Sequence, residues 1–209
     1  MAKKKEVQSS VKDESLIEKR RTQMIQAAVQ LFKEKGFHRT TTREIAQAAG
    51  FSIGTLYEYI RTKEDILFLV CDNIYNEVQA RISTLAMERG TIAELKSAIE
   101  QYYTLIDDMN DEFVVMYQES KSLQKDALAY VLKKELEMVA IFEEMLRTCY
   151  DNDSLTIERE DIPLAAQHIV IQGQMWAFRR WALAKQYSLG QFIERSQQQL
   201  LQGMIKGVS

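Results

Sequence analysis

The chain has 209 residues, of which 46% are hydrophobic, enough for one medium domain or two small domains and without any sign of global disorder. It contains only 1 Pro and 8 Gly, and because strand-rich folds need frequent turn residues, this composition predicts an all-α protein. The net charge of −3 is uneven, since residues 1–65 hold 13 Lys and Arg against 9 Asp and Glu, while the remainder holds 14 against 21. This asymmetry suggests that only the basic first third approaches a polyanion, with statistical scatter as the alternative.

Several classes of protein are disfavoured by what the sequence lacks. Cys71 and Cys149 each stand alone in apolar helical patterns, so we expect buried thiols in a reducing cytoplasm rather than a metal site or a disulfide. No apolar run approaches about 18 residues and the N-terminus has no hydrophobic signal core, which favours a soluble cytoplasmic protein with no membrane partner. No Gly-rich phosphate loop or metal-ligand cluster is visible, which argues against an enzyme and against a bound cofactor.

The first elements in chain order are an arm and a helix. Residues 1–14, with three consecutive lysines and no periodic hydrophobicity, are predicted to form a disordered basic arm. A helix is expected to begin at about Ser15, with Glu18 at capping-box spacing, and Gly36 is expected to end it in a left-handed conformation. Apolar residues at three- and four-residue intervals form one buried stripe of this helix: Ile17, Met24, Ile25, Ala28, Leu31 and Phe32.

Two short helices and six longer ones are predicted after the first, for a total of about nine. The short segments, about 42–49 and 52–59, are too short to be stable alone and must pack on the first helix. Pro163 fits the first turn of one of the longer helices. The longer amphipathic helices are expected at about 63–89, 91–107, 112–121, 124–150, 160–185 and 188–206.

The segment from about Thr40 to Lys63 has the composition of a helix-turn-helix. Thr41 or Thr42 can cap its first helix, and Gly50 permits the sharp turn that follows. Ser52 can cap the second helix, which leaves backbone N–H groups and the positive end of the helix dipole available to a phosphate.

The second short helix has an inner and an outer side by its spacing. Leu56 and Ile60 lie four residues apart and are expected to point to the core. Gly54 permits close approach of a partner. The residues left with much of their surface available for an external partner are Ile53, Thr55, Tyr57 and Tyr59.

These residues resemble the DNA-binding domain of the TetR family of bacterial repressors. The family pattern appears as Thr41-Thr42, Ile45-Ala46-Gln47-Ala48-Ala49-Gly50, Ser52-Ile53-Gly54-Thr55-Leu56-Tyr57-Glu58-Tyr59 and Lys63-Glu64-Asp65-Ile66. The upstream stretch from Ala27 to Phe37 also fits the family's first helix and exit turn. Ile60 departs from the family, where Phe is usual, but it is still apolar. The resemblance covers about the first third of the chain and is ungapped.

The resemblance implies that the second short helix enters the major groove of DNA. The residues expected mainly to hold phosphates and set the register are Thr42, Arg43, Ser52, Tyr57 and Lys63. Ile53, Gly54 and Thr55 are expected nearest the base edges, with Tyr59 also in the interface. The alternative is that the tyrosines only cover the small core.

The resemblance also implies a homodimer, with an effector-binding and dimerisation domain over 63–209 after the DNA-binding domain over 15–62. The last two helices, about 160–206, would pair with those of a second copy, which places two recognition helices about one DNA turn apart. Their many apolar residues suit helices that face both their own core and a partner: Ile169, Val170, Trp176, Phe178, Trp181, Phe192, Leu200, Leu201 and Ile205.

The middle helices are expected, again by resemblance, to surround a pocket for a hydrophobic small-molecule effector such as a fatty acyl-CoA. The candidate effector-binding residues are Tyr102, Tyr103, Ile106, Met109, Phe113, Met116, Tyr117, His168, Gln172, Trp176 and Arg179. His168, Gln172 and Trp176 are expected to form one row at four-residue spacing. An arginine beside the tryptophans can bind an anionic head group or form a salt bridge, and plain core packing is the alternative for each apolar residue.

The predicted function is therefore a ligand-responsive transcriptional repressor that binds double-stranded operator DNA as a homodimer. An activator, or a repressor that needs a co-repressor, would use the same parts in the opposite sense. A helical scaffold that only contains this motif is the third class. Failure to bind DNA from its own promoter region at low salt would favour the scaffold.

Overall fold

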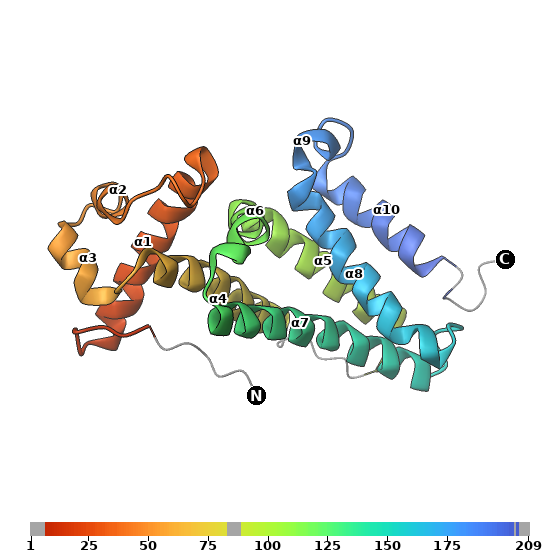
Figure 1. The fold of residues 1–209 in the computed structure, drawn as a ribbon. Helices are drawn as coiled ribbons and strands as arrows, with labels where there is room; N and C mark the ends of the chain where they lie inside the picture. The colour runs from red at the N-terminus through yellow and green to blue at the C-terminus, as the bar shows by residue number, and fades with distance from the viewer. Residues whose placement is uncertain (1–6, 83–88, 203, 205–209) are drawn as a thin grey trace. The chain divides into compact units, whose positions relative to one another are not determined.

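The computed structural model describes residues 7–82, 89–202 and 204, and within that part of the chain it contains ten α-helices, two one-turn 3-10 helices and no β-strand. The all-α prediction is confirmed (Figure 1). None of the described helices is both long and apolar enough to span a bilayer. In chain order they are α1 (Glu14–Lys35), α2 (Thr42–Ala48), α3 (Ile53–Tyr59), α4 (Lys63–Ile82), α5 (Ile92–Asp108), α6 (Asn110–Glu119), η1 (Ser120–Ser122), α7 (Lys125–Asp151), η2 (Arg159–Asp161), α8 (Ile162–Phe178), α9 (Arg180–Leu183) and α10 (Leu189–Leu201).

The predicted helix over 160–185 is interrupted, so the described residues contain ten α-helices where about nine were expected. Pro163 lies in the first turn of α8, as predicted. At Arg179, between α8 and α9, φ is −118° and ψ is 17°, outside the α-helical region. The break separates the four-residue helix α9 from the 17-residue helix α8. Hydrophobic periodicity continues across such a break, which is why the sequence predicted one helix.

The described chain divides into two compact units. The first consists of residues 7–74 and 111–133, and the second of residues 75–82, 89–110, 134–202 and 204. Two long helices, α4 and α7, contribute residues to both units. The first unit runs on through residue 74, so the boundary expected between residues 62 and 63 lies inside it. The first unit also includes nearly all of α6.

The start of α1 differs from its prediction by two residues. The expected cap at Ser15 is wrong: Asp13 caps α1, and its Oδ1 accepts hydrogen bonds from the backbone N–H groups of Ser15 at 3.0 Å and Leu16 at 3.2 Å. The end of α1 is as predicted. Gly36 has φ of 83°, and its N–H donates to Phe32 O at 2.8 Å.

The predicted disordered arm is wrong for its second half, and its first six residues lie outside the described ones. The backbone N–H of Ser10 donates to Glu58 O at 2.8 Å, and the Ser9 hydroxyl donates to the same oxygen at 2.9 Å. Val7 is buried, and its carbonyl accepts a hydrogen bond from the Arg21 guanidinium. Residues 7–10 therefore pack beside the end of α3, a long-range pairing that leaves no periodic signal in the sequence.

Helices α1, α2 and α3 pack on one another in the first unit (Figure 1). Leu56 and Ile60 are fully buried, as predicted, and Ile45 of α2 is fully buried as well. Gly50 has φ of 76° in the turn between α2 and α3, a conformation that favours glycine. The three-helix arrangement and its sharp turn form the helix-turn-helix expected from the sequence.

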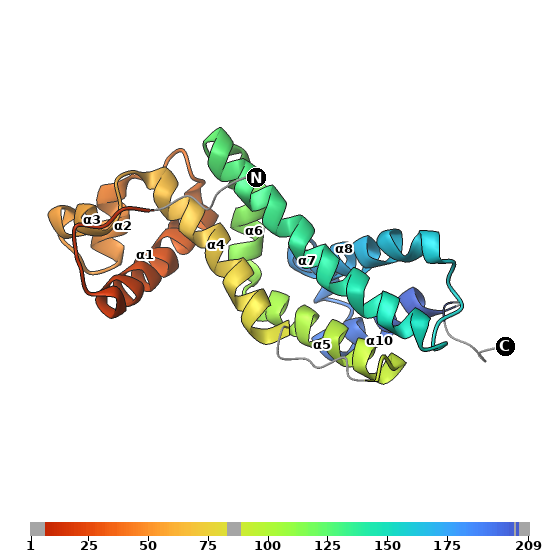
Figure 2. The ribbon, with the colours of Figure 1, turned by 90° about the horizontal axis from the view of Figure 1, so that it is seen from below.

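Helices α5, α8 and α10 pack on one another in the second unit (Figure 2). Gly173 of α8 permits the close approach of α5. A Cβ atom at Gly173 would lie 2.7 Å from the Tyr103 ring and 2.9 Å from Ile106 Cδ1. The Tyr103 hydroxyl donates to Ile169 O at 3.0 Å and connects the same two helices. Glycine at position 173 is therefore required for this interhelical distance.

Substitution of Gly173 by Ala should lower the free energy of unfolding by about 1–3 kcal/mol, because the added methyl group overpacks the contact between α5 and α8. Urea unfolding followed by circular dichroism would measure the change. Gly190→Ala is the control, since no atom lies within 4 Å of a Cβ at that position, and its stability should be unchanged or slightly raised. Equal stability of the two variants would contradict the packing argument.

Candidate functional site

The first helix of the candidate DNA-binding motif is fixed by a capping box. Thr41, one of the two residues expected to cap α2, has an Oγ1 that accepts the Glu44 N–H at 3.3 Å. Glu44 Oε2 in turn accepts the Thr41 N–H at 2.9 Å. Lys35 pairs with the other oxygen of Glu44. Hydrogen bonds from Lys35 and then from Thr41 lower the pKa of the Glu44 carboxyl to about 2, so the box stays ionised under ordinary conditions.

The second helix begins at Ser52, as predicted. Its Oγ accepts the Thr55 N–H at 3.0 Å and lies 2.9 Å from Thr55 Oγ1. Ile53 and Thr55 are half-buried, and Gly54 between them is exposed. The three residues expected nearest the base edges therefore lie together in the first turn of α3, with at least part of their surface open.

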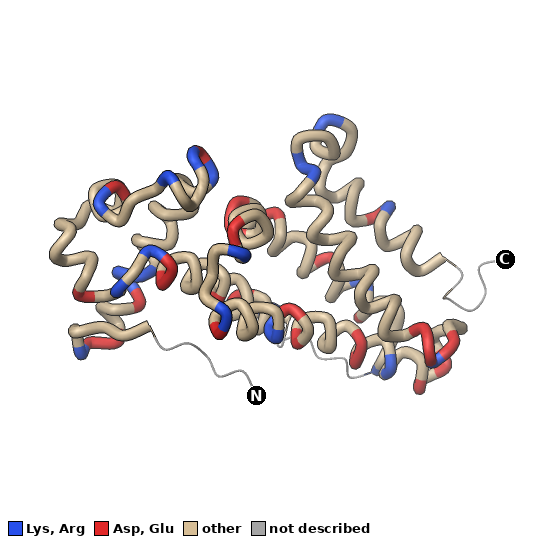
Figure 3. Tube along the Cα trace, viewed as in Figure 1, with Lys and Arg blue, Asp and Glu red and all other residues tan. Residues whose placement is uncertain are grey.

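The expected phosphate contacts come together from both short helices. Arg43 is exposed on α2, and no interaction with another described residue occupies its guanidinium. Tyr57 on α3 is 51% exposed, and its hydroxyl lies 3.1 Å from Thr42 Oγ1. This hydrogen bond connects α2 with α3 at the solvent surface. In Figure 3 the Lys and Arg residues of this part of the chain include those on α1 and α2 and directly after α3, whereas α3 itself carries none.

Two residues of the expected interface have structural roles. Tyr59 is only 3% exposed, so the prediction that much of its surface is available is wrong. It is the last residue of α3 and precedes Ile60, where the backbone becomes extended. Lys63 is engaged too: its Nζ donates to Phe37 O at 2.6 Å, Thr40 O at 2.8 Å and His38 O at 3.4 Å, all in the connection before α2. Burial of Tyr59 and the three acceptors of Lys63 were not visible from local spacing.

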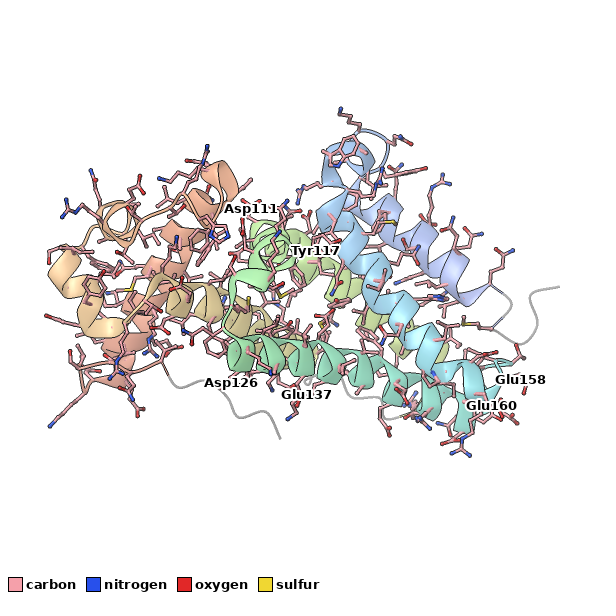
Figure 4. The ribbon with its side chains drawn as sticks, viewed as in Figure 1. Asp111, Tyr117, Asp126, Glu137, Glu158 and Glu160 are labelled. Atoms are coloured by element: carbon pink, nitrogen blue, oxygen red, sulfur yellow. The ribbon has the colours of Figure 1, made fainter. Side chains whose placement is uncertain are left out.

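Contacts between α6, η1 and the helix-turn-helix were missed by the sequence analysis. Glu119 Oε1 accepts the Phe37 N–H at 3.2 Å, directly after the Gly36 turn. Lys33 pairs with Asp111 at 2.9 Å; Figure 4 labels Asp111 on α6. His38 Nε2 lies 3.3 Å from Ser122 Oγ. These partners are 78 to 84 residues apart in the chain, and only an alignment of related sequences could carry a signal for them.

The residues expected to bind an effector fall into a buried and an exposed group. The buried group is Tyr102, Tyr103, Ile106, Met109, Phe113, Met116 and Trp176. Tyr117 is 68% exposed on α6 (Figure 4), His168 and Arg179 are exposed, and Gln172 is half-buried. Phe113, Met116 and Tyr117 belong to the first unit, and the others to the second. The assignment of the eleven residues to an effector stays a prediction.

The expected row of His168, Gln172 and Trp176 is wrong. His168 is exposed, whereas Trp176 is 2% exposed. Eight residues of an α-helix turn through about 80° more than two full turns, so the two ends of such a row face different ways. Trp176 Nε1 donates to Asp107 Oδ1 at 2.8 Å, and Arg180 pairs with the same oxygen at 2.5 Å. An arginine beside the tryptophans was expected either to bind an anionic head group or to form a salt bridge. Arg180 forms the salt bridge, with Asp107.

Both cysteines are free and buried, as predicted. Burial raises the pKa of the Cys71 thiol to about 12 and that of the Cys149 thiol to about 11, so neither is a thiolate at neutral pH. Within the described ranges no three His, Cys, Asp or Glu residues lie together as metal ligands.

Comparison with known proteins finds one family model that matches part of the first unit, and relatives and solved structures that match most of the chain. The model of the family described as "Bacterial regulatory proteins, tetR family" matches residues 24–70. The HTH-type transcriptional regulator HbdR of Aromatoleum sp. (strain CIB) is 31% identical over 198 residues, 93% of this chain and 84% of that protein. A tetR-family regulatory protein from Rhodococcus RHA1 has a TM-score of 0.76 at 24% identity, over 87% of this chain and 97% of that one. AibR, solved with isovaleryl coenzyme A and operator DNA, has a TM-score of 0.73 at 16% identity, over 86% and 97% of the two chains.

Proposed function

Because the chain belongs to the TetR family of bacterial transcriptional regulators, we propose that it is a repressor that binds a palindromic operator as a homodimer and is released by a hydrophobic small molecule. Members of this family are DNA-binding regulators rather than enzymes. The observation that carries the proposal is the capped pair α2 and α3, with Arg43 and Tyr57 at the surface beside the open first turn of α3. Because bacterial operator DNA lies in the cytoplasm, the proposal also places the protein there.

In the proposed complex α3 lies in the major groove. Ile53 and Thr55 would contact base edges, with Gly54 permitting close approach. Arg43, Thr42 and Tyr57, together with the N-terminus of α3 at Ser52, would contact phosphates and set the register. Lys63 would stabilise this surface without contacting DNA, because its ammonium already donates hydrogen bonds to the carbonyls that precede α2. Tyr59 would act in the core only.

Arg43→Ala should weaken binding to DNA from the protein's own promoter region, and by a similar factor for every DNA sequence tested. The slope of log K against log salt concentration should become shallower by about 1, since one phosphate contact is lost. Fluorescence anisotropy at several salt concentrations would measure both quantities. Arg159→Ala is the charge-matched control, because Arg159 is exposed in the acidic segment around η2 (Figures 3 and 4). Equal binding by the two variants would defeat the proposed interface.

A homodimer is proposed through the region of about 160–206, and the exposed face of α8 supports it. Leu164 is 55% exposed and Ile171 is 57% exposed, one heptad apart. Phe178 continues the same spacing and is half-buried. Exposed apolar residues in such a stripe are typical of a helix that packs on another chain. Several apolar residues expected to serve two faces are instead buried in the chain's own core: Ile169, Val170, Trp176, Phe192 and Leu201.

Ile171→Glu should shift the protein from dimer to monomer in sedimentation experiments, because it places a charge in the centre of the proposed interface. Leu132→Glu is the control, since Leu132 is an aliphatic residue of similar exposure, 56%, but lies on α7. It should remain dimeric. A dimeric Ile171→Glu protein would rule out this face.

A hydrophobic effector such as an acyl-CoA is proposed from the apolar and aromatic interior of the second unit, where Tyr102, Tyr103 and Ile106 are fully buried. Binding of isovaleryl coenzyme A by AibR, which shares this fold, is consistent with that class. An effector shifts the equilibrium toward release only if it prefers the released state. A ligand that prefers the DNA-bound state would make the protein a co-repressor-dependent regulator or an activator instead.

Acyl-CoAs should raise the unfolding temperature of the protein, because a ligand that binds only the folded state stabilises it. Differential scanning fluorimetry with acyl chains of several lengths would detect this, with coenzyme A alone as the control. No stabilisation at any chain length would remove acyl-CoAs as the effector class while leaving the DNA-binding proposal intact.

A further inference from the structure

Four helices bring polar side chains together inside the second unit. Glu135 of α7 accepts a hydrogen bond from Gln174 Nε2 of α8 at 2.6 Å through Oε1, and one from the Tyr75 hydroxyl of α4 at 3.3 Å through Oε2. Tyr102 of α5 is fully buried and close enough that the charge of Glu135 acts on its pKa. We call Tyr75, Tyr102, Glu135 and Gln174 the Tyr102 cluster.

The Tyr102 hydroxyl is the unsatisfied group of this cluster. Its oxygen is buried and forms no hydrogen bond of normal distance and angle with any described residue, although the Gln174 amide lies near enough to lower the pKa of Tyr102 against the two larger effects. Burial, and next the nearby Glu135 carboxylate, raises the pKa of Tyr102 well above its usual range, so the hydroxyl keeps its proton. Buried hydroxyl groups in folded proteins are almost always paired. Tyr102 is therefore a neutral O–H donor beside the paired polar groups of Tyr75, Glu135 and Gln174.

The surroundings of Tyr102 are aromatic. Its ring lies 5.2 Å from the Phe142 ring and 6.0 Å from the Tyr103 ring, centroid to centroid. Phe192 lies 5.9 Å from Tyr103 and continues the series to Trp176 at 4.9 Å. The other polar atoms of this series are already paired, because the Tyr103 hydroxyl donates to Ile169 O and Trp176 Nε1 donates to Asp107. In this aromatic series the Tyr102 hydroxyl is therefore the polar group left without a hydrogen-bond partner among the described residues.

The Glu135 carboxylate limits which ligand atom can accept a hydrogen bond from the Tyr102 hydroxyl. Both carboxylate oxygens of Glu135 already accept hydrogen bonds. Burial raises the pKa of Glu135 above its ordinary value, which reports the cost of one carboxylate in this interior. A second carboxylate, that of a free fatty acid, would add repulsion to this cost. An uncharged carbonyl oxygen accepts from Tyr102 without that penalty.

We propose that the Tyr102 hydroxyl donates a hydrogen bond to the carbonyl oxygen of an uncharged acyl group, and that the cluster thereby selects thioesters against free carboxylic acids. Glu135 and Gln174 are positioning residues, since they bond to each other and not to the ligand. This inference rests on the effector proposal above and specifies which atom of the effector is recognised.

Thioesters and thioethers of coenzyme A separate this hydrogen bond from the remaining contacts. Isovaleryl-CoA and lauroyl-CoA would be compared with S-isopentyl-CoA and S-dodecyl-CoA, which replace only the carbonyl by a methylene group, and with isovalerate and laurate. Calorimetric titration of the wild-type protein should give about tenfold tighter binding of at least one thioester than of its thioether, as expected for one buried hydrogen bond, and weaker binding of the acids.

Tyr102→Phe should bind that thioester no more tightly than its thioether, while Tyr130→Phe, whose hydroxyl donates to Asp72 Oδ1 outside the Tyr102 cluster, should keep the tenfold preference. The unfolding temperature of ligand-free Tyr102→Phe should equal or exceed that of the wild type, because it removes an unpaired buried hydroxyl. Retained preference in Tyr102→Phe, equal binding of both compounds by the wild type, or no binding of either would overturn the inference. Binding of promoter DNA by the same proteins, measured in parallel, tests the regulator proposal separately.

Discussion

Helices of seven residues are not stable alone in water, and both α2 and α3 have that length. Their positions therefore depend on caps and on packing against α1. The capping box of Thr41 and Glu44 and the cap at Ser52 satisfy the free N–H groups at the start of each helix. The ammonium of Lys63 binds the carbonyls that lead into α2. A surface suited to DNA exists only because these polar contacts hold two short segments in one geometry.

Helix α6 also holds the helix-turn-helix in place through polar contacts. Glu119 binds the backbone N–H that follows the Gly36 turn, and Asp111 pairs with Lys33 near the end of α1. The exit of α1 is thus held by a helix that lies far away in sequence but belongs to the same compact unit. The chain crosses between the two units within α4, within α7 and at the junction of α5 and α6.

The features that could be predicted from the sequence have local causes. Thr41, Ser52 and Gly36 act within three or four residues of the groups they bind, and the spacing of Leu56 and Ile60 reports one buried face. Prediction failed where the partner is remote: residues 7–10 pair with the end of α3, and Tyr59 turns inward where that helix ends. Most effector residues were chosen as large and apolar, a criterion that cannot separate plain core from a binding site. Glu135 and Gln174 were not predicted because their contacts join helices that are 39 to 60 residues apart in the chain.

A buried polar group without a partner destabilises a protein by about 1–3 kcal/mol. Tyr102 carries such a group in the interior of the second unit. If a ligand pairs it in only one state, the same energy becomes differential affinity, equivalent to about a 5- to 150-fold shift between states. A complete switch needs about 10⁴-fold, so burial of the ligand's apolar part must supply the rest. The hydroxyl then decides which molecules act as effectors, and apolar contact decides how strongly they act.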